Sequence, residues 1–121
     1  MDNLDKPSAR TETTPDVYDS AAEEDSAVVK AAAGSLFGFS GYNNSASAVY
    51  IQIHNAASLP ANSTVPNTGI ILLVQPGQSY AWSSGRYGRR MSTGVVIAAS
   101  STDTTLTVKT DTAQLFSVDY K

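Results

Sequence analysis

Short runs of apolar and β-branched residues, separated by turn residues, occupy the chain from Ala27 onward. The alternation is clearest over Ala48–His54, where Val49, Ile51 and Ile53 fall on one face of a strand. The pattern predicts eight strands, with a further short piece at Tyr87–Met91: Val28–Ala33, Leu36–Tyr42, Ala48–His54, Ile70–Gln75, Ser79–Ser83, Val95–Ala99, Leu106–Lys109 and Leu115–Tyr120.

Gly, Asn, Pro and Ser punctuate these runs at the positions where turns are expected, and no long helical stripe interrupts them. About eight strands in one domain indicate an all-β fold, a single jelly-roll-like β-sandwich. Ile70–Val74 and Val95–Ala99 are continuously apolar. Such runs are typical of strands that are covered on both faces, so we expect both to be central.

Residues 1–26 have a different texture, rich in charge, Ser and Thr, with at most one helical turn at Ala21–Asp25. They carry eight acidic side chains against two basic ones, whereas residues 27–121 carry three against six. We therefore expect an acidic, extended N-terminal arm (1–26) before a β-sandwich body (27–121), and docking of the arm on a neighbouring subunit. The predicted anchors are apolar (Leu4, Val17 and Tyr18) and acidic (Asp16, Asp19, Glu23 and Glu24).

The residues that usually carry enzymatic chemistry are sparse. There is no Cys, His54 is the single imidazole, and the body's carboxylates Asp103, Asp111 and Asp119 stand apart. A metal or cofactor site is not expected from so few ligands. The sequence contains neither the G-x-S-x-G motif of a nucleophile elbow nor the glycine-rich motif of a phosphate-binding loop. We therefore predict that the protein is not an enzyme. No run approaches the length of a membrane helix, so no membrane contact is expected.

The most distinctive local cluster is Gly85-Arg86-Tyr87-Gly88-Arg89-Arg90, which is flexible, basic and aromatic. Arg and Tyr are enriched at protein interfaces, so one interpretation is a docking loop for the acidic arm of a neighbouring copy, with contacts from Arg86, Tyr87, Arg89 and Arg90. The other interpretation, a solvated basic turn, fits the sequence equally well. Nucleic-acid binding is not expected, because the basic excess is small and phosphate would repel the acidic arm.

Tyr80 and Trp82 lie two residues apart, on one face of a predicted strand. Such a pair can stack on a sugar ring, but it more often caps a core or packs in an oligomer interface. We keep both interpretations, a glycan face and an oligomer or core face.

Four segments follow one another along the body: G-S-L-F-G-F-S-G-Y-N from Gly34, Y-I-Q-I-H-N-A-A-S-L-P-A from Tyr50, S-G-R-Y-G-R-R from Ser84 and T-G-V-V-I-A-A-S-S-T from Thr93. In this order they resemble small β-sandwich structural domains from the virions of tailed bacteriophages. The resemblance covers about residues 34–121 and implies a domain that decorates or connects parts of the particle. An arm before a jelly-roll body is similar to capsid cement (decoration) proteins, which often form trimers over junctions between capsomers.

The resemblance leads us to expect a cement protein that bridges neighbouring major capsid subunits and stabilises the head. It would be made in the host cytoplasm, act as a homo-oligomer, most simply a trimer, and sit on the outer capsid surface. Two alternatives remain at this stage. One is a head-fibre or tail-associated adhesin domain that presents Tyr80 and Trp82 to a host glycan, and the other is a neck or tail connector.

Overall fold

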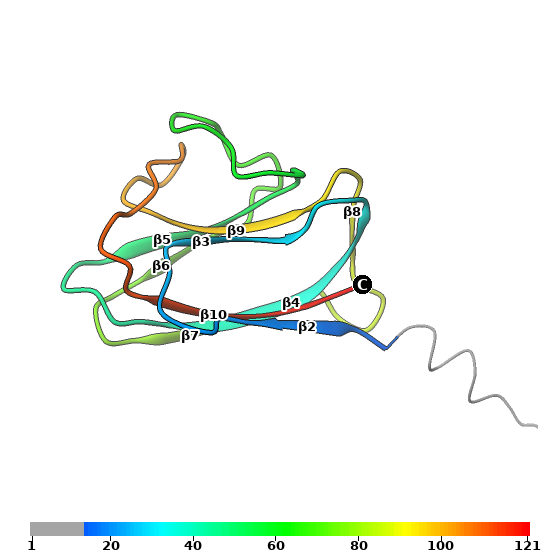
Figure 1. The fold of residues 1–121 in the computed structure, drawn as a ribbon, viewed down its shortest axis with the longest axis horizontal. Helices are drawn as coiled ribbons and strands as arrows, with labels where there is room; N and C mark the ends of the chain where they lie inside the picture. Colours follow the sequence, from blue (N-terminus) through cyan, green and yellow to red (C-terminus); the bar gives the residue numbers. More distant parts are fainter. Residues whose placement is uncertain (1–13) are drawn as a thin grey trace, which may run out of the picture.

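Nine antiparallel strands form two facing sheets in residues 14–121, the part of the chain that the computed structural model describes (Figure 1). The first sheet has the order β2 (Asp16–Asp19), β10 (Gln114–Tyr120), β4 (Gly34–Asn43) and β7 (Ser79–Ser83), and β8 (Arg89–Met91) pairs with the start of β4. The second sheet has the order β3 (Ser26–Lys30), β9 (Val95–Ser100), β5 (Val49–His54) and β6 (Ile71–Val74). The predicted all-β sandwich is confirmed.

The core lies between the two sheets. Inward side chains of β4 and β10, such as Phe39 and Val118, meet those of β5 and β9, such as Ile51 and Ile97. These residues are at most 4% exposed. Burial of a side chain of this size stabilises the fold by roughly 1.5–3 kcal/mol, so the two sheets are held together mainly by apolar contact.

The far side of the second sheet is covered as well. Val96 and Ala98, which point away from the core cluster, are fully buried, and so is Leu106 from the segment after β9. Figure 1 shows the loops before β6 and after β9 folded over this side. The double burial of β9 confirms the prediction of a central strand at Val95–Ala99.

Two predictions about strands were wrong. Ile71–Val74 forms the edge strand β6, and Leu73 is 55% exposed. Leu106–Lys109 forms no strand: Val108 makes an isolated bridge to Ser100, and Leu106 exchanges backbone hydrogen bonds with Ser63 and Thr64 instead. In both segments the apolar residues indicated burial or a preference for extended backbone. They did not indicate which strand, if any, would be the neighbour.

Residues 14–26 belong to the sandwich rather than to a free arm. Strand β2 pairs with β10 at the edge of the first sheet, and β3 begins at Ser26 in the second sheet. The segment between them crosses from one sheet to the other (Figure 1) and shows bends rather than a helical turn at Ala21–Asp25. Residues 14–26, which their polar composition assigned to an arm, therefore form backbone hydrogen bonds with strands β10 and β9. The predicted anchor Leu4 lies outside the described residues.

Candidate functional site

The first sheet turns one face away from the second sheet, and we call this its outer face. Cross-strand pairing arranges the outward side chains in three rows. The rows are Val17–Asp119–Gly38–Ser83, Asp19–Ser117–Ser40–Ala81 and Leu115–Tyr42–Ser79. The middle of the face is therefore built from small side chains, with larger ones at its ends.

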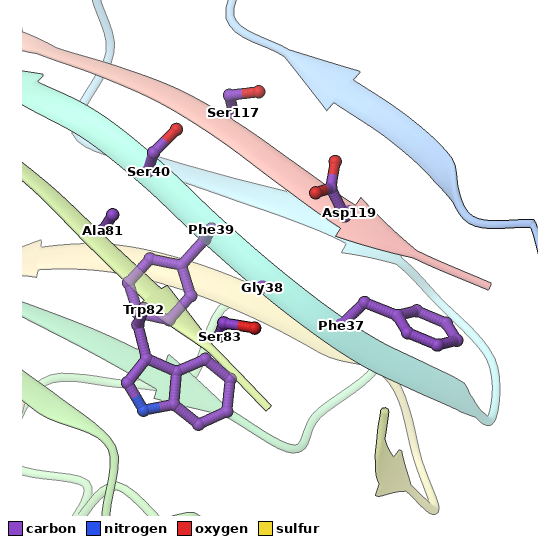
Figure 2. A pocket seen from close by; sticks show the side chains of 9 residues that line it. All are labelled: Phe37, Gly38, Phe39, Ser40, Ala81, Trp82, Ser83, Ser117 and Asp119. Carbon is purple, nitrogen blue, oxygen red and sulfur yellow. The ribbon is translucent and has the colours of Figure 1, made fainter. Parts of the chain in front are cut away.

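A shallow hollow of about 240 Å³ lies over this centre, and we call it the trough. Its lining includes Phe37, Ser40, Ser117 and Asp119, and Figure 2 shows the last three projecting to the same side of the sheet. Ser117 Oγ donates to Asp19 Oδ1 at 2.6 Å. The trough thus combines serine hydroxyl groups and the carboxylate of Asp119 with the aromatic residue Phe37.

The outer face carries acidic charge on its β2 and β10 side. Asp19 and Asp119 lie there, and neither has a basic partner among residues 14–121, where the ion pair is Lys109–Asp111 at 3.5 Å. Because no cation among the described residues offsets these two acidic side chains, this side of the face has a negative potential that attracts basic groups.

The Arg–Tyr turn, residues 84–90, borders the opposite side of the trough. Ser84 attaches the turn to β4, because its Oγ donates to the carbonyl of Leu36 at 2.7 Å. Gly85 and Gly88 adopt φ values of 88° and 77°, which favour glycine, and a Cβ at Gly88 would lie 3.1 Å from the Phe37 ring. The turn is therefore bonded to β4 through Ser84 and lies against Phe37 beside the trough.

The predicted interface residues of this turn differ in what they offer. Tyr87 is 83% exposed, and the guanidinium of Arg86 lies 5.2 Å from the centre of its ring, within cation–π range. Arg90 is exposed and pairs in register with Ser35. Arg89 instead donates from Nη2 to the Thr68 carbonyl at 3.0 Å, which ties the turn to the loop before β6.

Tyr80 and Trp82 face the core. Trp82 stacks on Phe39 with centroids 5.5 Å apart and an interplanar angle of 21°, and Tyr80 meets Phe39 edge-on at 6.3 Å. The Tyr80 hydroxyl lies where a Cβ at Gly41 would be, and burial raises the pKa of Tyr80. The pair therefore caps the core, and its ring faces are not presented on the outer face as a sugar platform.

The predicted anchors within residues 14–26 are divided between internal and outward positions. Val17 and Asp19 belong to the outer face, and Asp16 is exposed at the end of β2. Tyr18 points inward, and its hydroxyl donates to Glu24 Oε2 at 2.6 Å. Burial, with the hydrogen bond to Glu24, raises the pKa of Tyr18 to about 12.

The remaining acidic anchors also make contacts within the chain. Glu23 accepts from Asn44 Nδ2 at 2.7 Å, and the backbone of Glu24 exchanges hydrogen bonds with that of Gln114. Tyr18, Glu23 and Glu24 thus fasten the segment to its own sandwich. Val17 and Asp16 are exposed, and Asp19 is also exposed although it accepts a hydrogen bond from Ser117.

His54, the single imidazole, is 1% exposed on the covered side of the second sheet. Its Nε2 lies 2.9 Å from Gln52 Oε1, and Gln52 Nε2 donates to the carbonyls of Thr102, Asp103 and Thr105. Burial lowers the pKa of His54. The geometry makes it part of the polar packing beneath the loop after β9.

Metal sites, membrane-spanning helices and relatives are the remaining sources of a functional assignment. No three His, Cys, Asp or Glu side chains within residues 14–121 are grouped so that they could hold a metal ion. The same part of the chain contains no helix that is both long and apolar enough to span a membrane. No protein family, curated protein or solved structure matches the chain.

The outer face as a whole was missed by sequence reasoning. The feature of the sequence that could indicate this face is the alternation of Gly38, Ser40 and Tyr42 with the inward Phe39 in β4. A similar alternation occurs in β10. The pattern shows two faces for each strand, but only the pairing of strands from distant parts of the chain brings the small residues together.

Proposed function

We propose that this protein is a structural subunit of a tailed-bacteriophage head, a cement protein that binds the major capsid protein and stabilises the shell. The observation that carries the proposal is the Arg–Tyr turn, where Tyr87 is 83% exposed on a turn anchored by hydrogen bonds. Exposed Tyr and Arg on a rigid support are typical of residues that dominate the energy of protein interfaces.

The sandwich is suited to a mechanical role. Both ends of the described chain are tied into it, because β2 and β10 pair with each other and Lys121 N donates to the carbonyl of Ser35. The load on a cement protein would be transmitted through hydrogen-bonded ladders of this kind. The position of His54 supports a non-catalytic role, since the only imidazole is buried and cannot reach a substrate in solvent.

In this proposal the arginines serve contacts between neighbouring copies on the shell. Arg86 and Arg90 are exposed beside the trough, while Asp19 and Asp119 offer acidic partners on the same face. The shell is stabilised when such subunits are tied both to one another and to the capsid protein. The inward packing of Tyr80 and Trp82 makes the glycan-binding alternative the weaker one.

The direct test uses heads of the encoding phage from which the gene for this chain has been deleted. Purified full-length protein is added, and co-sedimentation with the heads and the temperature of DNA release are measured. We expect saturable binding and release at a higher temperature. Tyr87→Ala should reduce uptake about tenfold or more. Its control, Val65→Ala, removes a 64% exposed side chain on another loop and should bind normally. Absence of binding by the wild-type protein would refute the proposal.

A further inference from the structure

The outer face and the Arg–Tyr turn gather exposed apolar side chains. Of the eight large apolar residues that are exposed within residues 14–121, three lie on the outer face and one in the adjoining turn. They are Val17 at 57% exposure, Tyr42 at 38%, Leu115 at 39% and Tyr87 at 83%. Apolar groups concentrated around one surface are typical of an interaction site.

The centre of this surface allows another flat surface to approach closely. Gly38, Ser40, Ala81 and Ser117 have no side chain longer than a hydroxymethyl group. Two sheets normally pack about 10 Å apart, with side chains filling the space between them. Small residues shorten this separation, so the larger side chains at the ends of the face can reach a partner.

Charge divides the surface into two halves. The acidic residues Asp19 and Asp119 lie on the β2 and β10 side, and the basic residues Arg86 and Arg90 lie beyond β7 and on β8. All of them except Asp19 lie toward the end of the first sheet at which β10 finishes and β8 pairs with β4. A surface that is divided in this way is complementary to a turned copy of itself.

We propose that two copies of this chain pack outer face to outer face, related by a twofold axis that runs along the strands between β10 and β4. This axis places β4 over β10 of the partner subunit and β7 over β2 of the partner subunit, and it keeps each residue at its level along the strands. The order β2-β10-β4-β7 of the first sheet dictates this exchange.

The contacts that follow match apolar with apolar and acid with base. Leu115 meets Tyr42 of the partner subunit, because these two residues are neighbours in one row on the two central strands. Arg86 passes over the end of β2 of the partner subunit, where Val17 and Asp119 lie side by side. The twofold axis repeats each contact, as in any isologous pair.

The size of the surface predicts the strength of the pair. Four strands about 4.8 Å apart and about five residues long cover roughly 300 Å² per copy. The two copies together would bury roughly 600 Å² in the sheets, which is below the area of stable specific interfaces and is typical of weak, transient contacts. We therefore expect a weak dimer, with a dissociation constant on the order of hundreds of micromolar, that weakens further with salt. The pairing needs no capsid, so its test is independent of the proposed function.

The experiment is sedimentation velocity of the purified full-length protein up to several hundred micromolar. We expect a reversible monomer–dimer equilibrium. Ser40→Lys places a long cation in the trough and should raise the dissociation constant about tenfold or more. The control Thr104→Lys makes the same charge change at an exposed site on the loop over the second sheet and should leave the equilibrium unchanged.

A charge exchange tests the pairing in detail. Arg86→Glu and Asp119→Lys should each weaken the dimer several-fold, and the double variant should recover most of the loss, since both symmetric contacts are restored with reversed sign. A wild-type protein that stays monomeric, a trimer, a dimer that resists Ser40→Lys, or a double variant without recovery would each overturn the inference.

Discussion

Gln114 donates from Nε2 to Asn43 Oδ1 at 2.7 Å, across the two central strands of the first sheet. Both side chains are fully buried. The same Asn43 amide donates from Nδ2 to the carbonyls of Ser47 and Val74, at 3.0 and 3.1 Å. Because Val74 ends β6 of the second sheet, one side chain links the two sheets and the turn between β4 and β5.

Replacement of Asn43 by Ala should destabilise the protein by about 3 kcal/mol, because several buried polar groups would lose their partner at once. The measurement is urea unfolding followed by tryptophan fluorescence. Asn44→Ala is the matched control, since Asn44 is exposed and bonds only to Glu23 through its side chain. Its expected loss is within about 0.5 kcal/mol. Equal losses in the two variants would contradict the linking role of Asn43.

Shortening the chain should reveal that residues 14–26 are part of the fold. The fragment 14–121 keeps every strand described here, whereas 27–121 loses β2, the first residue of β3 and the Tyr18–Glu24 hydrogen bond. We expect 27–121 to melt at least about 10 °C below the full chain, since a loss of 1 kcal/mol lowers the melting temperature by about 4–8 °C in a domain of this size. Calorimetry of the two fragments decides the point, and equal melting temperatures would show that the segment is a dispensable arm.

Stability should fall as the pH is lowered through the range in which His54 titrates. Burial lowers the pKa of His54 in the folded chain, so the unfolded chain, with a pKa near 6.5, takes up the proton more readily. The contribution of neutral His54 to the free energy of unfolding is fully present above about pH 6.5. It is lost as the pH falls below that value, by no more than about 1.4 kcal/mol per pH unit. The free energy of unfolding should therefore be lower at pH 5.5 than at pH 7.5.

His54→Gln is the control for this pH dependence, because glutamine does not titrate. Its free energy of unfolding should change less between the two pH values. Asp25 acts in the opposite direction: burial, opposed in part by hydrogen bonds from Thr112, raises its pKa, so its contribution grows as the pH falls. A wild-type slope equal to that of His54→Gln would contradict the buried, neutral imidazole.

Trp82→Ala should destabilise the fold by about 3 kcal/mol or more, because the ring packs against Phe39 and the core cluster. Ser83→Ala, at the neighbouring exposed position, should have little effect. Chemical denaturation of both variants measures the difference. A Trp82→Ala protein of undiminished stability would mean that the ring does not cap the core.

Local patterns in the sequence predicted most strands but not their neighbours. Val95–Ala99 and Ile70–Val74 look alike as apolar runs, yet β9 is central and β6 is an edge. The difference arises from β3, which pairs with the free side of β9 and comes from a segment far away in the chain. The alternation of apolar and polar residues within one segment does not predict pairing between distant segments. For the same reason the sequence did not predict β2, which lies in a polar segment.

The candidate site shows the same division. The exposure of Tyr87 and Arg86 follows from a Gly-rich turn, which a local motif can indicate. The alternation of Tyr80 and Trp82 predicted a shared face, but a period of two does not reveal which face meets the core. That choice depends on the register of β7 with β4, which brings Trp82 beside Phe39.

The number of copies of this protein in each particle tests the central claim most directly. Under the proposed function the encoding virus is a tailed phage, and quantitative mass spectrometry of its purified virions gives the ratio of this chain to the major capsid protein. The account predicts hundreds of copies, in a fixed ratio to the capsid protein. About a dozen copies, the stoichiometry of a neck or tail ring, or none at all, would contradict it.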